Sequence, residues 1–297
     1  MLVPSAGGSR YILTFIDDYS RYTTVYLLKT KDEVLNKFKQ FVALMENHSH
    51  QIKKLNIINC VRSDNGGEYK SELFKTFCEE KGISHQFTNP YSPQQNGVSE
   101  RMNRTIVESA RSLLYHAKLP LTFWAEAVNT AVYLRNRSPT SVRKGCTPFE
   151  LWFDRKPDVS NLRVFGCICQ VFIPDELRKK LEPKSYKAIF VGYPDDTKGY
   201  KVYNISSGKY SRSNNVWFSE GVFHDFSTSD VVDHNITFPE DTNENPQIEN
   251  VNVNKETNEI VQIQNDLPDS DELNNADSVG ASNAQHIGQV NSEDMNI

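Results

Sequence analysis

Residues 56–67 read Asn-Ile-Ile-Asn-Cys-Val-Arg-Ser-Asp-Asn-Gly-Gly and join a short apolar run to a glycine turn. The run at 56–61 is typical of a buried β-strand. The strand ends at polar residues that include Asp64, and the two glycines that follow allow a sharp turn and a close approach of another backbone or of a ligand. The stretch therefore predicts a strand that carries a carboxylate at its C-terminal end, where the carboxylate can face a metal ion.

Strand and helix patterns alternate on both sides of this stretch. Residues 10–28 contain two β-branched and aromatic runs around a polar turn, which predicts a β-hairpin. An apolar stripe at helical spacing follows Asp32, a candidate N-cap, and a second helix is bounded by Ser71 and Gly82. Residues 1–140 are therefore expected to form an α/β domain with a mixed sheet and flanking helices.

The pattern changes after residue 140. Short runs rich in β-branched and aromatic residues recur between residues 160 and 222, and turn residues such as Ser206-Ser207-Gly208 separate them. Residues 141–225 are therefore expected to hold a linker helix and a second, smaller domain, which is a small β-barrel or a sandwich.

Charge divides the chain into two parts. Residues 1–225 carry 32 Lys and Arg and 23 Asp and Glu, whereas residues 226–297 carry 15 acids and a single base, Lys255. A basic front part is expected of a protein that binds a polyanion. Residues 226–297 also hold 13 Asn and only two aromatic residues, so they offer little apolar surface to offset the entropy of ordering. This acidic, Asn-rich tail is predicted to be disordered.

The cysteines and the hydropathy restrict the compartment. The five cysteines form an odd set without C-x-x-C spacing, which favours reduced, buried thiols over a disulfide scaffold or a four-ligand zinc site. No apolar run reaches ~18 residues, and the N-terminus has no secretion signal. We expect a protein of the nucleus or the cytoplasm that is neither secreted nor embedded in a membrane.

A second carboxylate, Glu100, lies at a sequence spacing from Asp64 that is typical of a known family of enzymes. Glu100 lies early in a predicted helix that follows a Pro- and Gly-rich loop at 89–97, and 35 residues separate it from Asp64. This arrangement resembles the D,D-35-E integrase core of retroviruses and long-terminal-repeat retrotransposons. Residues 11–22 and 147–152, together with the Val-Phe-Gly-Cys and Phe-Val-Gly-Tyr segments further on, look like the copia branch. The resemblance extends from about residue 10 to about residue 222.

The resemblance implies a ribonuclease-H-like fold and an integrase encoded within a Pol polyprotein. Such an integrase binds two Mg²⁺ or Mn²⁺ ions, processes the 3′ ends of element DNA and joins them to target DNA. Two hard cations ~3.5–4 Å apart need several carboxylate oxygens. Asp64 would bridge or ligate metal, and Glu100 would hold the second ion. The implied partners are double-stranded DNA, from element ends and target, and further copies of the chain in a homo-oligomer.

The chain departs from the family pattern at its start. In this family the first catalytic Asp lies on a strand before the hairpin, and no such Asp precedes residue 10. We therefore expect an N-terminally truncated piece of a polyprotein, a truncated gene model or a decayed copy. Asp17 and Asp18 resemble a structural turn of the family, and Asp17 is also a candidate substitute ligand. The alternative function is that of a catalytically dead DNA-binding or interaction protein derived from a retroelement.

Basic and amide side chains near Glu100 are candidate DNA contacts, because phosphate oxygens accept hydrogen bonds from such groups. Arg104 lies one helical turn beyond Glu100, and the others lie beside it or in the preceding loop. The candidates are Gln95, Asn96, Arg101, Asn103 and Arg104. The alternative for the helical residues is a solvated basic face.

Overall fold

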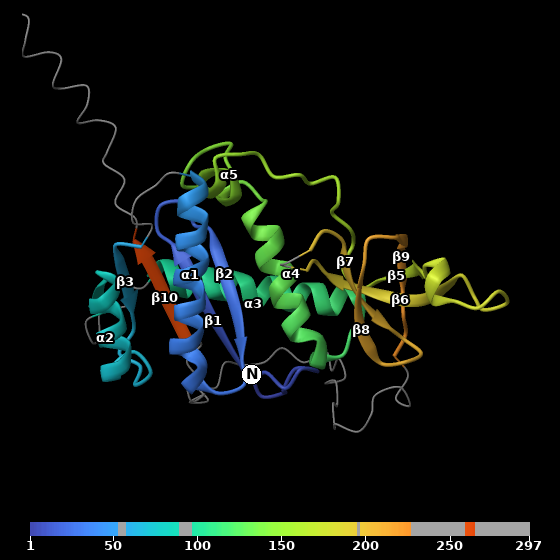
Figure 1. Cartoon of the computed structure of the whole chain (residues 1–297), viewed down its shortest axis with the longest axis horizontal. Helices are drawn as coiled ribbons and strands as arrows, with labels where there is room; N and C mark the ends of the chain where they lie inside the picture. The colour runs from blue at the N-terminus through green and yellow to red at the C-terminus, as the bar shows by residue number, and fades with distance from the viewer. Residues whose placement is uncertain (53–57, 89–96, 195–196, 227–258, 265–297) are drawn as a thin grey trace, which may run out of the picture. The chain divides into compact units, whose positions relative to one another are not determined.

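A computed structural model describes residues 1–52, 58–88, 97–194, 197–226 and 259–264 (Figure 1). Its strands form two five-stranded sheets. The first sheet has the order β2-β1-β10-β3-β4, and the second has the order β8-β7-β6-β5-β9. No helix in the described part of the chain combines the length and the apolar character that a membrane span requires.

The first sheet is mixed, as the sequence predicts. Its strands are β1 (Tyr11–Asp17), β2 (Thr23–Leu28), β3 (Cys60–Ser63), β4 (Ser84–Phe87) and β10 (Glu259–Gln264). β1 and β2 form the expected antiparallel hairpin, and β3 and β4 run parallel to each other. β3 begins later than the predicted run, and Asp64 follows its last residue directly.

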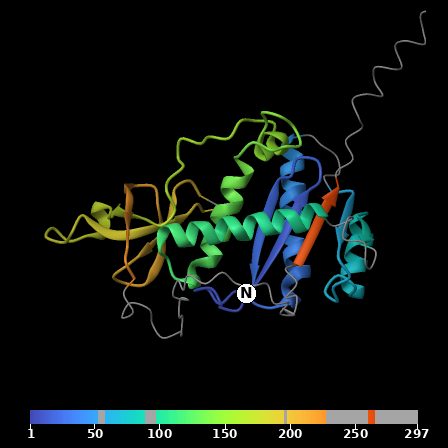
Figure 2. The ribbon, with the colours of Figure 1, turned by 180° about the vertical axis from the view of Figure 1, so that it is seen from behind.

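The strand β10 corrects the prediction that residues 226–297 are disordered throughout. β10 lies between β1 and β3 in the middle of the sheet, parallel to β1 and antiparallel to β3 (Figure 2). Its sequence, Glu-Ile-Val-Gln-Ile-Gln, holds three β-branched residues in six, a local strand pattern that the composition of the whole tail conceals. Apart from Phe226, the rest of the tail lies outside the described residues.

Helices cover both faces of the first sheet (Figures 1 and 2). They are α1 (Val34–Ile52), α2 (Glu72–Lys81), α3 (Gly97–Ala117) and α4 (Trp124–Asn136). Leu13 and Phe15 of β1 pack in one core cluster with α1 and α2, whereas Ile12 and Ile16 pack in another with α3 and α4. Because successive side chains of a strand point to opposite faces, β1 supplies both cores.

The helix ends follow capping rules. Ser71 caps α2 by accepting a hydrogen bond from the backbone N–H of Phe74, and Gly82 ends the helix in the left-handed conformation, as predicted. The predicted cap at Asp32 is wrong. Asp32 lies inside a short 3-10 helix (Lys31–Glu33) that precedes α1, and the Glu33 carboxylate accepts hydrogen bonds from the backbone N–H groups of Lys29 and Thr30.

The second sheet is antiparallel throughout, and it is open where a closed barrel was one expectation. Its strands are β5 (Cys167–Phe172), β6 (Ser185–Gly192), β7 (Tyr200–Asn204), β8 (Lys209–Ser213) and β9 (Val216–Phe223). β8 and β9 form its two edges. Ile189 and Val191 of β6 join the core cluster of α3 and α4. The sheet therefore covers one of its faces with helices and has no need to close on itself.

The predicted linker helix is α5 (Pro148–Phe153). Thr147 precedes it and forms a capping box with Glu150, because the Thr147 hydroxyl accepts from the Glu150 N–H at 3.1 Å and the Glu150 carboxylate accepts from the Thr147 N–H at 2.7 Å. This reciprocal pair fixes the residue at which α5 begins.

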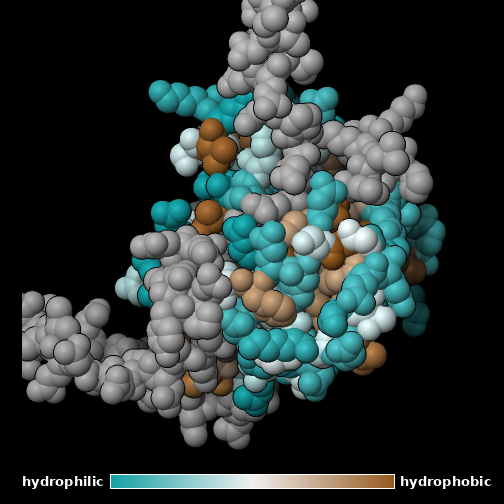
Figure 3. Space-filling view, turned by 90° about the vertical axis from the view of Figure 1, so that its left-hand side faces the viewer, coloured by the Kyte–Doolittle hydropathy of each residue, from teal (hydrophilic) through white to brown (hydrophobic). Residues whose placement is uncertain are grey.

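The side of the molecule that carries α2 and β4 is mainly hydrophilic in its described surface, with smaller hydrophobic areas between hydrophilic residues (Figure 3). Leu73 of α2 is 72% exposed and Phe87 of β4 is 41% exposed. β4 is an edge strand of the first sheet, and most of its residues are exposed to solvent.

Candidate functional site

Asp64 lies at the C-terminal end of β3, where the sequence predicts it. Its Oδ1 accepts a hydrogen bond from the backbone N–H of Gly66 at 3.0 Å. Burial raises the pKa of the Asp64 carboxyl, the Gly66 N–H opposes this shift, and the neighbouring Glu68 carboxylate adds to it. The ionised form of Asp64 therefore lacks full compensation from the protein itself, and a cation would stabilise it.

Glu68 is a functional candidate that the sequence reasoning missed. A Cβ atom built on Gly66 would lie 2.5 Å from Glu68 Oε1 and 3.0 Å from Asp64 Oδ1, so both carboxylates crowd the same glycine. Lys31 Nζ lies 3.6 Å from Glu68 Oε1. The signal was present in the sequence as a carboxylate four residues after Asp64, directly beyond the glycine pair.

The turn after β3 is tied to the end of β4. Asn65 Nδ2 donates to the carbonyl oxygen of Thr88 at 2.7 Å, and the Thr88 N–H donates to the Ser63 carbonyl oxygen at 3.0 Å. Ser63 Oγ lies 2.9 Å from His85 Nε2, and burial lowers the pKa of His85. These bonds tie the turn that carries Asp64 to the end of β4, which is the support that a metal ligand needs.

Glu100 lies in the first turn of α3 and is exposed to solvent. Arg101 and Arg104 are exposed on the same helix. Gln95 and Asn96 lie outside the described residues. Within the described residues, no group of three or more His, Cys, Asp and Glu side chains is arranged to hold a metal ion, so Asp64 and Glu100 are not joined there in a ready three-ligand site.

Asn103 does not lie where the prediction of DNA contacts needs it. Its side chain is only 7% exposed, and its Oδ1 accepts a hydrogen bond from Thr14 Oγ1 of β1 at 2.9 Å. Asn103 belongs to the buried stripe of α3 together with Met102 and Ile106. It therefore joins the helix to the sheet and is not available to a phosphate group.

Asp17 lies at the end of β1 and is 3% exposed. Its Oδ2 accepts hydrogen bonds from both the backbone N–H and the hydroxyl of Ser20. Burial is the main cause that raises the pKa of the Asp17 carboxyl. Next to it, Asp18 forms an ion pair with Arg21, which has a positive φ of 63°. Asp17 thus organises the β1–β2 turn, in line with the structural role that the resemblance implies.

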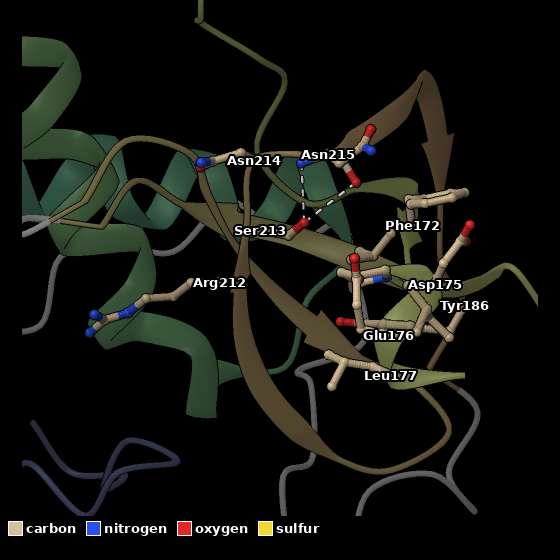
Figure 4. A pocket seen from close by; sticks show the side chains of 12 residues that line it. Phe172, Asp175, Glu176, Leu177, Tyr186, Arg212, Ser213, Asn214 and Asn215 are labelled. Carbon is tan, nitrogen blue, oxygen red and sulfur yellow. Dashed lines mark hydrogen bonds between the residues drawn. The ribbon is translucent and has the colours of Figure 1, made fainter. Parts of the chain in front are cut away.

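A cavity of about 700 Å³ on the second sheet holds none of the predicted site residues (Figure 4). Asp175 and Glu176 line it, together with Arg212 of β8 and the turn that follows β8. Ser213 Oγ accepts from the Asn215 N–H at 3.2 Å, which orders this turn. The two acids disfavour a polyanionic ligand here.

Comparisons with known proteins find relatives that match about three quarters of the chain. Residues 1–93 match the family model of the integrase core domain, and residues 167–233 match that of the retroviral polymerase SH3-like domain. The chain is 48% identical over 221 residues to the retrovirus-related Pol polyprotein from transposon TNT 1-94 of Nicotiana tabacum. This match covers 74% of the chain and 16% of that polyprotein. The chain is also 39% identical over 225 residues to the retrovirus-related Pol polyprotein from transposon RE2 of Arabidopsis thaliana. This match covers 76% of the chain and 15% of that polyprotein.

The chain thus spans less than a fifth of the length of these curated relatives. Among solved structures, the HTLV-2 integrase catalytic core domain in complex with magnesium, in its trimeric form, matches with a TM-score of 0.33 and 20% identity, over 46% of this chain and 79% of that one.

Proposed function

Because the chain belongs to the integrases of copia-type retrotransposon Pol polyproteins, we propose that it carries out metal-dependent DNA integration, by 3′-end processing and strand transfer. Its substrates are the double-stranded DNA ends of the element and the target DNA. The chain acts on them as a homo-oligomer.

The observation that carries the proposal is the place of Asp64. Its half-buried carboxylate ends β3, lies beside Glu68 and has a raised pKa. Paired oxygen donors of this kind fit a hard divalent cation such as Mg²⁺ or Mn²⁺. Asp64 and Glu100 would hold the ions, and the Glu68 carboxylate lies beside the same glycine as Asp64.

Bound in pairs, such ions activate the attacking oxygen and stabilise the leaving oxygen of an in-line phosphoryl transfer. The residues of the chain itself hold the metal-binding carboxylates and the DNA in position. The Gly66 N–H fixes one oxygen of Asp64, and the bonds between Asn65, Thr88 and Ser63 keep the turn in place. Arg101 and Arg104, which are exposed on the helix that carries Glu100, would contact DNA phosphates.

The alternative is a DNA-binding protein without catalytic activity. It is favoured by one observation, namely that no three-carboxylate cluster is assembled within the described residues. Such a protein would bind DNA without metal and would lose affinity as salt is added, because its binding would rest on contacts to phosphates.

The experiment that tests the proposal is a strand-transfer assay. The full chain is incubated with a labelled duplex that carries an element end, a supercoiled target plasmid, and Mn²⁺ or Mg²⁺. We expect joined product, and we expect Asp64→Asn and Glu100→Gln each to reduce it at least about 100-fold, as loss of a group that stabilises the transition state does.

Glu108→Gln is the matched control, because Glu108 is an exposed carboxylate of the same helix. It should leave the product unchanged. Joined product that survives both Asp64→Asn and Glu100→Gln refutes the assignment of the catalytic residues. Metal-independent DNA binding by an unaltered chain that makes no product supports the alternative.

A further inference from the structure

A cavity of about 760 Å³ lies where α4, α5 and the second sheet meet, away from the carboxylates of the first sheet. Four cationic side chains line it: Arg137, Arg155, Lys156 and Lys198. Among the lining residues that the structure describes, the one acid is Asp158, whose carboxylate already accepts hydrogen bonds from the N–H and the hydroxyl of Ser160. The described residues that line the cavity therefore carry more positive than negative charge.

Aromatic rings alternate with two of these cations. The rings of Tyr193 and Tyr133 stack with centroids 4.0 Å apart. The guanidinium carbon of Arg137 lies 3.4 Å from the ring centroid of Tyr133 and 5.0 Å from the ring centroid of Phe149. The guanidinium carbon of Arg155 lies 5.5 Å from the same Phe149 ring. We call this series, from Tyr193 to Arg155, the cation–aromatic ladder.

Arg137 is held by a backbone hydrogen bond, and no carboxylate in the described part of the chain serves as its counter-ion. Its Nη1 donates to the carbonyl oxygen of Tyr133 at 3.2 Å, while its Nε is buried without a hydrogen-bond partner. Within the described residues Arg137 forms no ion pair with a carboxylate. A half-buried cation of this kind pays for lost hydration, and the aromatic rings compensate only part of that. An anion that enters the cavity would supply the rest.

We propose that this cavity binds the phosphate backbone of a DNA strand, with Arg137 as the fixed contact and Arg155, Lys156 and Lys198 as exposed contacts around it. The inference rests on the proposed function, because it takes DNA as the ligand. It places a DNA contact at the junction of α4, α5 and the second sheet, separate from Asp64 and Glu100.

DNA is favoured over a small anion by the surroundings of Arg137. Arg155, Lys156 and Lys198 are all exposed, so they can follow a charged backbone past the mouth of the cavity. Residues 1–225 as a whole carry 32 Lys and Arg against 23 Asp and Glu, which adds a general attraction to polyanions.

The cation–aromatic ladder also predicts that a positive charge at position 137 is not by itself sufficient for full DNA affinity. A guanidinium is planar, so it can lie between Tyr133 and Phe149 and still offer an N–H edge to a phosphate oxygen. A lysine ammonium at position 137 would keep the charge but could neither stack in this way nor present two parallel donors.

The test is a fluorescence-anisotropy titration of a labelled DNA duplex with the full chain, in EDTA and at several salt concentrations. We expect Arg137→Gln to weaken binding about tenfold, as loss of a charge-assisted contact does. We also expect it to make the affinity less dependent on salt, so that the negative slope of log K against log salt becomes smaller in magnitude by about one. Arg137→Lys should also weaken binding several-fold, and so should Arg155→Gln, whose exposed side chain puts folding at little risk.

Lys75→Gln on α2 is the control, because it removes the same charge from an exposed residue that does not line the cavity. It should change the affinity less than twofold. Thermal unfolding checks that each variant is folded.

The result that overturns the inference is equal affinity for Arg137→Gln, Arg155→Gln and Lys75→Gln, or an Arg137→Lys variant that binds like the unaltered chain. If the unaltered chain binds DNA and makes Asp64-dependent product while Arg137→Gln binds normally, this inference alone fails. If the unaltered chain does not bind DNA at all, the proposed function fails with it.

Discussion

A Cβ atom on Gly192 would lie 2.7 Å from Thr130 Oγ1, so β6 and α4 meet with no room for a side chain between them. Gly192 also has a φ of +136°, a conformation that other residues rarely adopt. This contact belongs to the junction through which the second sheet shares the core of α3 and α4.

Gly192→Ala is therefore expected to destabilise the chain, because it adds both a clash and backbone strain. The expected loss in the free energy of unfolding is about 2–4 kcal/mol, measured by urea denaturation. Gly97→Ala is the control, since a Cβ there meets nothing within 4 Å. Equal stability of the two variants would show that β6 and α4 do not pack this closely.

Asp64→Asn is expected to raise the melting temperature of the metal-free chain at neutral pH. The pKa of Asp64 is raised on folding, mainly by burial, so the folded state binds the proton more tightly than the unfolded state. The stability of the unaltered chain must then fall as the pH rises from the unfolded value near 3.8 through the raised folded value. Asp64→Asn has no carboxyl group to ionise at this position, so its stability does not fall in this way.

The measurement is thermal unfolding of both chains across that pH range in EDTA, repeated with Mn²⁺ at neutral pH. The metal should stabilise the unaltered chain and leave Asp64→Asn unchanged, because a ligand stabilises only the state that binds it. Stabilisation of both chains to the same extent would place the metal away from Asp64.

Removal of β10 is expected to weaken the first sheet. A chain that ends at Asn258 lacks the strand between β1 and β3, so both of these strands present unpaired edges. Compared with a chain that ends at Asn265, it should unfold at a lower temperature and self-associate on size-exclusion chromatography. If the two chains behave alike, β10 is not a stable part of the sheet.

The thiols are expected to react in two classes. Burial raises the pKa of Cys78 to about 11, and those of Cys167 and Cys169 to about 12. Thiolate is the reactive form, so these groups should resist a thiol reagent at pH 8. Cys146 is only half-buried and should react first. Mass spectrometry of the labelled peptides gives the order, and rapid labelling of Cys167 or Cys169 in the folded chain would contradict it.

The sequence predicted those parts of the fold whose signals are local. The hairpin of β1 and β2 follows from β-branched runs around a turn, and α2 follows from Ser71 and Gly82, whose side chain and backbone act within a few residues. β10 escaped prediction because its partners, such as Leu13 for Glu259, lie far away in the chain and because the acidic tail around it masks a six-residue pattern.

The site was predictable to a similar degree. The strand end and the glycine turn around Asp64 are local features. Asn103 was misplaced because its polar side chain suggests exposure, although it lies in the same buried stripe as Ser99 and Ile106 at helical spacing. The cavity around Arg137 depends on contacts between α4, α5 and β6 that no local pattern encodes.

The central position of β10 has a consequence during synthesis. β1 and β3 leave the ribosome long before residues 259–264 emerge, so during that time the nascent chain lacks the strand that separates them in the folded sheet. Contacts between residues so distant in sequence form late and slowly, and open strand edges attract other chains in the meantime. The chain is therefore expected to depend on chaperones until residues 259–264 have emerged from the ribosome.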